Sequence, residues 1–324
     1  MSSKPLIKIE QSIPTTHSDQ KMSLRIFRNK YLITGSVDET VHIYNIFTNR
    51  KIRSYHSWTD PIIAVEVVKL RNVDLILFSD FCNRIFAYFF HNSKLFRYID
   101  VGYDAMHIYD FNDYENVLFI NERGDLGIWN LLTNSIIFQN SYETKIVAAQ
   151  RVSKEKTIFA LGSDHEIVLV VQINVTKNNV THQILNKIML HEEINEIYSI
   201  FEYSLVEKCL YVARNNVINI VKFDEDFSEE KIESYQLEED SSSTKIRALL
   251  LIDNFLIISA SERKYLLLYD LKTKTYQNID SSINFIYFEC AHKALDLFKL
   301  DNTYYFASVS HEFEEPILIY SFNL

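Results

Sequence analysis

Four arginines recur at one position of a repeated pattern, the short polar turn between the second and third predicted strands of a unit: Arg84, Arg123, Arg214 and Arg263. The guanidinium group is a planar fork of N–H donors that binds carboxylates and phosphates through paired hydrogen bonds. If these turns emerge on one face of the fold, we expect a partial ring of positive charge that binds an acidic or phosphorylated segment. The alternative is that each arginine pairs locally with an acid such as Glu122, Asp125 or Glu262.

Three aromatic residues fall in predicted loops between successive units, on the same face as the arginine turns: Trp58, Tyr103 and Tyr142. Aromatic side chains in such loops are frequent anchors of protein interfaces. The alternative is incidental placement, since the chain contains 20 Tyr and 22 Phe. With the four arginines, these three residues make up the predicted partner-binding site.

The sequence offers little for catalysis or for metal binding. It contains no GxSxG, Walker or HExxH motif, and its ten histidines are scattered. His165 and His311 lie near predicted second-to-third-strand turns, where a catalytic side chain would be reachable, but an exposed turn histidine is the simpler interpretation. Cys82, Cys209 and Cys290 are far apart, which is typical of reduced thiols and not of a disulfide framework or a zinc site. We expect no enzyme activity, no metal and no cofactor.

The totals restrict the partners. The net charge is −10, which argues against nucleic acid as a direct ligand, because phosphate neutralisation needs clustered Lys and Arg. The N-terminal residues lack the apolar core of a secretion signal, and no apolar run of about 18 residues could span a membrane. We therefore expect a cytoplasmic or nuclear location and other protein subunits as partners.

Strands must position these residues. Apolar residues make up 47% of the chain, and the many Phe and Tyr favour strands over helices. In the second unit, strands are predicted at Ile62–Val68, Leu75–Phe78, Ile85–Phe90 and Leu95–Ile99, while helical periodicity is weak throughout. With only 5 Gly and 4 Pro, the turns must use Asn, Asp, Ser and Lys instead.

An internal repeat organises the strands. The apolar or aromatic residue near the end of each third strand recurs about every 46 residues: Tyr44, Tyr88, Trp129, Val171, Val221, Tyr269 and Tyr320. Seven units of that length fill the 324 residues as one domain. The predicted units are 23–57, 61–100, 105–140, 145–190, 194–237, 245–280 and 294–324.

The last unit is one strand short, whereas residues 5–13 form an extra strand before the first unit begins. Pairing that strand beside the last unit closes a ring and removes two exposed sheet edges. We therefore expect the N-terminal strand to complete the final sheet.

The best-formed unit contains Thr34-Gly35-Ser36-Val37-Asp38-Glu39-Thr40 followed by Tyr44-Asn45. This segment resembles the signature of the WD-repeat β-propeller family, Ser-Gly-Ser-x-Asp-x-Thr with a strand that ends in Trp-Asp. Trp129-Asn130 and Tyr269-Asp270 are similar, although no unit has an intact Trp-Asp pair. The resemblance implies an all-β fold, a single seven-bladed propeller of four-stranded blades.

The resemblance also implies structural roles. In the family, a His, a Ser and a Trp form a buried hydrogen-bonded set that joins neighbouring strands, and His56, Ser79 and Tyr88 are the expected remnant of this set here. Asp38 is expected to cap its own tight turn, and Trp129 to fill the core.

Propellers of this family present protein-binding faces and rarely catalyse, so the resemblance implies a non-catalytic scaffold in a multiprotein complex. Three alternatives remain open. An accessory subunit of an RNA-modifying enzyme would need a basic patch. A substrate receptor of a ubiquitin ligase would read phosphorylated peptides with the arginine face. A propeller hydrolase would need a polar cluster in the channel.

Overall fold

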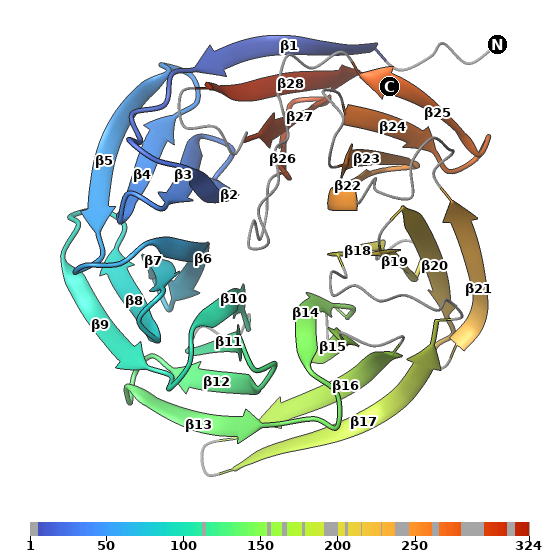
Figure 1. Ribbon diagram of the computed structural model, residues 1–324, viewed down its shortest axis with the longest axis horizontal. Helices are drawn as coiled ribbons and strands as arrows, with labels where there is room; N and C mark the ends of the chain where they lie inside the picture. Colours follow the sequence, from blue (N-terminus) through green and yellow to red (C-terminus); the bar gives the residue numbers. More distant parts are fainter. Residues whose placement is uncertain are drawn as a thin grey trace.

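A computed structural model describes residues 6–111, 115–153, 157–163, 167–176, 179–190, 200–204, 207–214, 216–227, 229–236, 246–260, 266–279, 295–309 and 315–323. These residues form seven four-stranded antiparallel sheets arranged as a ring (Figure 1). The fold is therefore an all-β, seven-bladed β-propeller, as predicted.

The first four blades follow one another along the chain. Blade 1 contains β2 (Lys21–Phe27), β3 (Tyr31–Ser36), β4 (Thr40–Asn45) and β5 (Arg50–His56). Blade 2 contains β6 (Ile62–Leu70), β7 (Val73–Asp80), β8 (Arg84–Phe89) and β9 (Leu95–Asp100). Blade 3 contains β10 (Ala105–Asp110), β11 (Asn116–Asn121), β12 (Leu126–Asn130) and β13 (Ser135–Asn140). Blade 4 contains β14 (Ile146–Arg151), β15 (Ile158–Ser163), β16 (Ile167–Val175) and β17 (Val180–Met189).

The remaining three blades complete the ring. Blade 5 contains β18 (Ile200–Ser204), β19 (Cys209–Arg214), β20 (Val217–Phe223) and β21 (Glu229–Gln236). Blade 6 contains β22 (Ile246–Ile252), β23 (Phe255–Ala260), β24 (Leu266–Asp270) and β25 (Thr275–Ile279). Blade 7 contains β26 (Leu295–Leu300), β27 (Thr303–Ser308), β28 (Ile317–Asn323) and, from the N-terminus, β1 (Leu6–Ile13).

The N-terminal strand closes the ring, as predicted. β1 pairs antiparallel with β28, with Ile13 opposite Ile317 and Leu6 opposite Asn323, and the pairing shifts between Ile9 and Gln11. Figure 1 shows β1 on the outer rim beside β28. This pairing joins two strands that are far apart in the sequence, so that neither β1 nor β28 is left with an unpaired edge toward the other.

The core lies between adjacent blades. Trp129 of β12 is fully buried and belongs to an apolar cluster that joins blades 2 and 3. Tyr44 of β4 and Tyr320 of β28, at the same position of their own blades, are also fully buried. In these three blades the recurring third-strand residue is thus a packing residue, which explains its apolar or aromatic character.

An ion network ties the inner strands of three blades together. Arg25 of β2 donates two hydrogen bonds to the Glu66 carboxylate of β6, at 2.7 and 2.6 Å, and lies 3.7 Å from Asp296 of β26. The same Asp296 carboxylate accepts a hydrogen bond from the Ile26 backbone N–H at 2.7 Å. These bonds therefore connect the innermost strands of blades 7, 1 and 2 around the channel.

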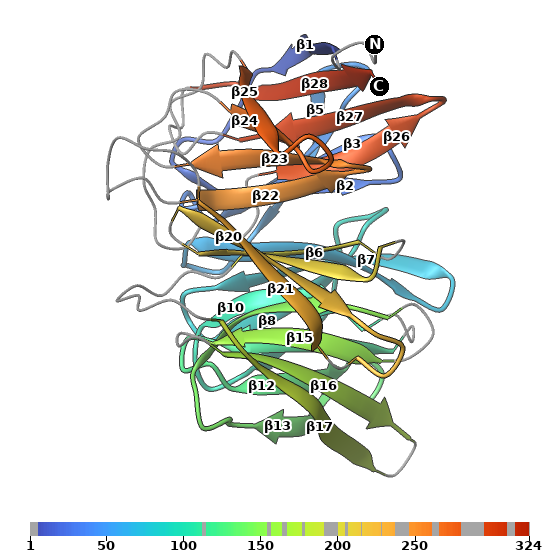
Figure 2. The same cartoon turned by 90° about the vertical axis from the view of Figure 1, so that its right-hand side faces the viewer.

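The antiparallel strands give the ring two distinct faces. Turns between the second and third strands, and the loops between blades, lie on one face, here called the top face. Turns between the first and second strands, and between the third and fourth strands, lie on the opposite bottom face. Figure 2 shows the ring from the side, with the strands running between these two faces. Many turns use non-glycine residues with positive φ, among them Asn83 at 63° and Asn134 at 56°, as the low glycine content predicts.

Candidate protein-interaction site

The top-face loops of blades 2 and 3 form one continuous surface. The Val101 N–H donates to the Asn83 carbonyl at 2.8 Å, and the Asn83 N–H donates to the Asp104 carboxylate at 3.2 Å. The Glu122 N–H donates to the Asp104 carbonyl at 2.8 Å. These bonds link the turn that precedes Arg84 to the turn that carries Arg123.

Arg84 is already engaged by two carboxylates. Its guanidinium donates to Asp80 at 2.9 and 2.6 Å and to Asp60 at 2.8 Å. The Asp80 side chain is fully buried and the Arg84 side chain is only 15% exposed. Burial alone would lower the Arg84 pKa, but the hydrogen bonds to Asp80 and the negative charges of Asp80 and Asp60 raise it. Arg84 therefore pairs with nearby acids, as the alternative interpretation expected, although the acids are Asp60 and Asp80 and not those named from the sequence.

Arg123 presents its guanidinium to solvent. The guanidinium carbon lies 3.8 Å from the centre of the Tyr103 ring, a cation–π contact. Within the described ranges Arg123 makes no ion pair, and its turn is held by Asn121, whose side-chain oxygen accepts the Arg123 and Asp125 N–H groups at 3.0 and 2.9 Å. A carboxylate or phosphate that approaches this turn meets an unneutralised cation.

Of the four arginines predicted to form a ring of positive charge, only Arg123 is exposed and unpaired among the described side chains. The structure brings Arg84 and Arg123 to one face, but Arg84 carries no available positive charge. Arg214 ends β19, and its side chain lies outside the described residues. Arg263, and likewise His165 and His311, also lie outside them.

Trp58 is an exposed aromatic residue with a fixed orientation. Its side chain is 49% exposed, and its ring makes edge contacts with Phe86 at 5.2 Å and Tyr98 at 4.7 Å. The Arg84 guanidinium lies 5.1 Å from the same ring. Phe81, in the turn before Arg84, is 39% exposed. We call Trp58, Phe81, Tyr103 and Arg123 the top patch.

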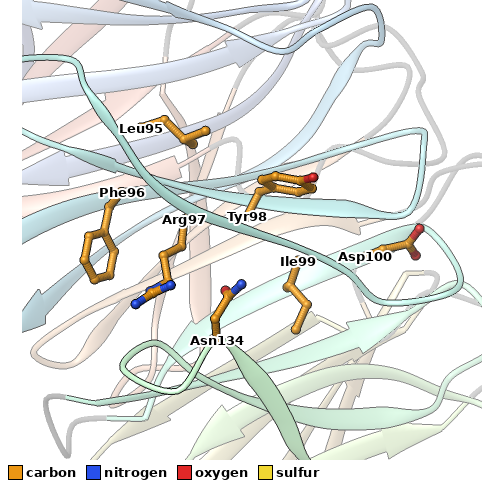
Figure 3. Close-up of a pocket in the computed structure, with 7 residues that line it drawn as sticks. All are labelled: Leu95, Phe96, Arg97, Tyr98, Ile99, Asp100 and Asn134. Atoms are coloured by element: carbon orange, nitrogen blue, oxygen red, sulfur yellow. The ribbon is translucent and has the colours of Figure 1, made fainter.

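A shallow hollow continues from this patch onto the rim of blade 2. It encloses about 510 Å³ and is lined by Leu95, Phe96, Arg97, Tyr98, Ile99, Asp100 and Asn134. Figure 3 shows Tyr98 and Leu95 on one side of β9 and Arg97, Ile99 and Asn134 on the other. Because Tyr98 also contacts Trp58, an apolar segment docked on the top patch can extend into the hollow.

Tyr142 does not join the predicted site. Its ring packs between blades 3 and 4 and meets the His182 ring at 6.3 Å, and its hydroxyl is buried. Burial raises the Tyr142 pKa to about 12. Tyr142 thus fills the core instead of anchoring a surface.

The predicted hydrogen-bonded set of His56, Ser79 and Tyr88 is not formed. The Tyr88 hydroxyl reaches the backbone oxygen of His56 at 3.5 Å, and the His56 side chain is exposed. The Ser79 hydroxyl is buried, and among the described residues it has no hydrogen-bond partner. Blade 2 keeps aromatic packing here, with the Phe78 and Tyr88 rings stacked at 5.4 Å, in place of a polar set.

A different hydrogen-bonded set exists in blade 1, around His17. The His17 ring bonds Thr34 at 2.8 Å and Asp38 at 3.0 Å. It stacks on the His42 ring at 3.9 Å, and His42 contacts the Tyr44 hydroxyl at 3.2 Å. We call these five residues the histidine clasp. Within its own turn the Asp38 carboxylate also accepts the Thr40 N–H at 3.1 Å. The Thr16-His17 pair before β2 was the sequence signal for this set that the prediction missed.

The clasp shifts two pKa values. Burial alone would raise the pKa of Asp38, but the hydrogen bond and charge of His17, with hydrogen bonds from Thr40 and Ser18, lower it below its usual range. Burial, then the charge of His17, lowers the His42 pKa to about 3. His42 is therefore neutral at neutral pH.

The described part of the chain shows no group of three or more His, Cys, Asp or Glu side chains arranged to hold a metal ion. It also contains no helix long and apolar enough to cross a membrane. No protein-family model matches this sequence, and no curated protein matches it.

Proposed function

We propose that this chain is a divergent WD-repeat propeller that serves as a non-catalytic protein-interaction scaffold, a subunit of a multiprotein complex, and that a partner docks on the top patch. The observation that carries the proposal is Trp58. A half-exposed indole held by two rings and a guanidinium loses little side-chain freedom when a partner covers it, and such preorganised aromatics dominate interface energies.

The chemistry of the partner follows from the patch. Trp58 and Phe81 offer an apolar platform, and Arg123 offers one cation for a carboxylate or a phosphate. Around it the surface is acidic: burial first, and then the charges of Glu122, Asp80 and Asp60, raise the Asp104 pKa. We therefore propose a segment with apolar anchors and a single acidic or phosphorylated group, because a run of acids would be repelled.

The test compares capture by three variants of the full chain expressed in its own cells. Trp58→Ala and Arg123→Glu alter the top patch, and Ile184→Ala changes a 48% exposed residue of β17 as the control. We expect a stoichiometric protein partner that Trp58→Ala and Arg123→Glu lose and Ile184→Ala keeps. If all three variants retained the partner equally, the partner would dock at a site other than the top patch. A chain that purifies alone and hydrolyses an ester would overturn the scaffold role.

A further inference from the structure

The bottom face of blades 1 and 2 carries a cluster of cations that the net charge of −10 conceals. Its turns and strand ends contribute six exposed basic side chains: Arg28, Lys30, Arg50, Lys69, Arg71 and Lys94. With Phe47, which is 50% exposed in the β4–β5 turn, we call them the bottom patch.

The turns that carry these cations touch one another. The Arg28 guanidinium bonds the Asp74 carboxylate, and the His91 ring lies 4.0 Å from the same oxygen. The Phe27 and Tyr31 rings both pack at 5.1 Å on Phe90, next to His91. Cations from two blades therefore share one surface.

The β4–β5 turn joins the same surface. The Ile46 N–H donates to the Lys30 carbonyl at 2.9 Å, which places Phe47 beside the cations of blade 1. On the blade 2 side, the Phe89 N–H donates to the Lys94 carbonyl at 2.9 Å. An exposed aromatic ring is thus part of the positively charged surface.

Little of this charge is neutralised. Asp74 is paired with Arg28, and Arg71 lies 3.5 Å from Glu115, with both side chains of that pair well exposed, so this second pair is weak. Among the described residues, Lys30, Lys69 and Lys94 have no ion-pair partner. The same holds for Arg50.

Backbone preference does not explain Arg71. Arg71 occupies the first position of a two-residue turn with φ of 54°, and the matching positions of blades 6 and 7 are Asp253 at 49° and Asp301 at 52°. Asp and Asn adopt this left-handed region more readily than Arg does. The arginine therefore has a worse local fit than the acids that occupy equivalent turns.

We propose that the bottom patch binds single-stranded nucleic acid, with phosphates on the cations and a base stacked on Phe47. Cations distributed over several turns follow a phosphate backbone, and an exposed ring among them is a stacking platform for a base. A peptide made of acidic residues alone would use the cations but would leave Phe47 exposed. This inference is independent of the top patch, which lies on the other face.

The probe is a fluorescent 12-nucleotide uridine RNA, with a thymidine DNA of the same length, in an anisotropy titration against the full chain. With about four phosphate contacts, the affinity should fall about 50-fold between 50 and 200 mM salt. Lys30→Glu, Arg50→Glu, Lys69→Glu and Lys94→Glu combined should weaken binding by at least about 30-fold. The DNA arm shows whether the ribose contributes.

The matched control reverses four exposed lysines elsewhere, Lys8, Lys145, Lys187 and Lys272, and so has the same net charge. Equal weakening by this control would overturn the proposal, because binding would then follow overall charge. Phe47→Ala should cost about tenfold, whereas Ile52→Ala, at a 43% exposed neighbour in β5, should not. An oligoglutamate or phosphorylated peptide that binds more tightly than the RNA, or a chain that binds neither oligonucleotide at 50 mM salt, would also overturn it.

Discussion

The two faces of blades 1 and 2 carry opposite charge, although the same strands build both. The top-face turns, loops and adjoining strand ends contain seven acids and two cations, one of which, Lys21, is buried: Asp19, Asp38, Glu39, Asp60, Asp80, Asp100, Asp104, Arg84 and Lys21. The corresponding bottom-face positions contain six exposed cations and the buried Asp74. Because successive turns alternate between faces, a modest alternation of charge along the chain becomes a separation of charge in space.

The acids and the cations also serve different ends. Top-face acids build the turns: Asp80 accepts the Cys82 and Arg84 N–H groups at 3.1 and 3.2 Å, and Asp38 accepts the Thr40 N–H at 3.1 Å. Bottom-face cations make few bonds within the fold. Top-face charge therefore stabilises the protein, whereas most bottom-face charge is exposed and unpaired among the described residues.

The sharpest test of the top face is Arg84→Met. It leaves the fully buried Asp80 carboxylate without its cation, and we expect a loss of about 3 kcal/mol in the free energy of unfolding. Urea denaturation at pH 7 measures it. Adding Asp80→Asn removes the buried charge and should restore most of the loss; no recovery would mean that Arg84 acts through packing instead.

The histidine clasp gives the top face a pH dependence. The unfolded chain binds a proton at His42 near pH 6.5, whereas the folded chain does so only near pH 3. The contribution of neutral His42 to the free energy of unfolding is therefore fully present above about pH 6.5. Below that pH it falls by up to about 1.4 kcal/mol per pH unit. Asp38, with its lowered pKa, adds a loss only at still lower pH, as it becomes protonated.

Between pH 7 and pH 5 we expect a loss of about 2 kcal/mol, measured by urea denaturation across that range. His42→Gln should flatten the slope. His91→Gln, at a 67% exposed histidine of the bottom face, should leave the slope in place. An unchanged slope in His42→Gln would exclude the clasp as its source.

Arg123→Met should have a much smaller effect than Arg84→Met. The exposed cation–π contact with Tyr103 contributes about 0.5–1 kcal/mol, so the midpoint of urea denaturation should shift only slightly. Tyr103→Leu should give a similar loss, and the double variant should lose no more than either one. A loss as large as that of Arg84→Met would show that Arg123 is also part of the fold.

The smallest effect is expected on the bottom face. Lys69→Glu removes an exposed cation that has no ion pair among the described residues, so the free energy of unfolding should change by less than about 0.5 kcal/mol. At low salt the change should be slightly stabilising, because repulsion from neighbouring cations is relieved, and it should vanish at high salt. Destabilisation of more than about 1 kcal/mol would show that Lys69 also stabilises the fold, which would contradict the difference between the two faces.

Much of the fold was predictable because its signals are local. Alternating strands, polar turns and the recurring third-strand residue indicated seven blades, and the extra N-terminal strand indicated how the ring closes. The polar set was misplaced because a histidine near a blade boundary has the same sequence signal at His56 as at His17. Only packing shows that His17 faces Thr34 and Asp38 while His56 faces solvent.

The amino-acid sequence predicted the strands, their number and the closure of the ring, since each depends on local pattern and on pairing of sheet edges. It also determined that Arg84 and Arg123 share a face. Folding alone brings Asp60 and Asp80 onto Arg84 and leaves Arg123 open to solvent. It alone decided where charge collects, because net charge sums the chain, whereas a ligand meets the turns that folding brings together.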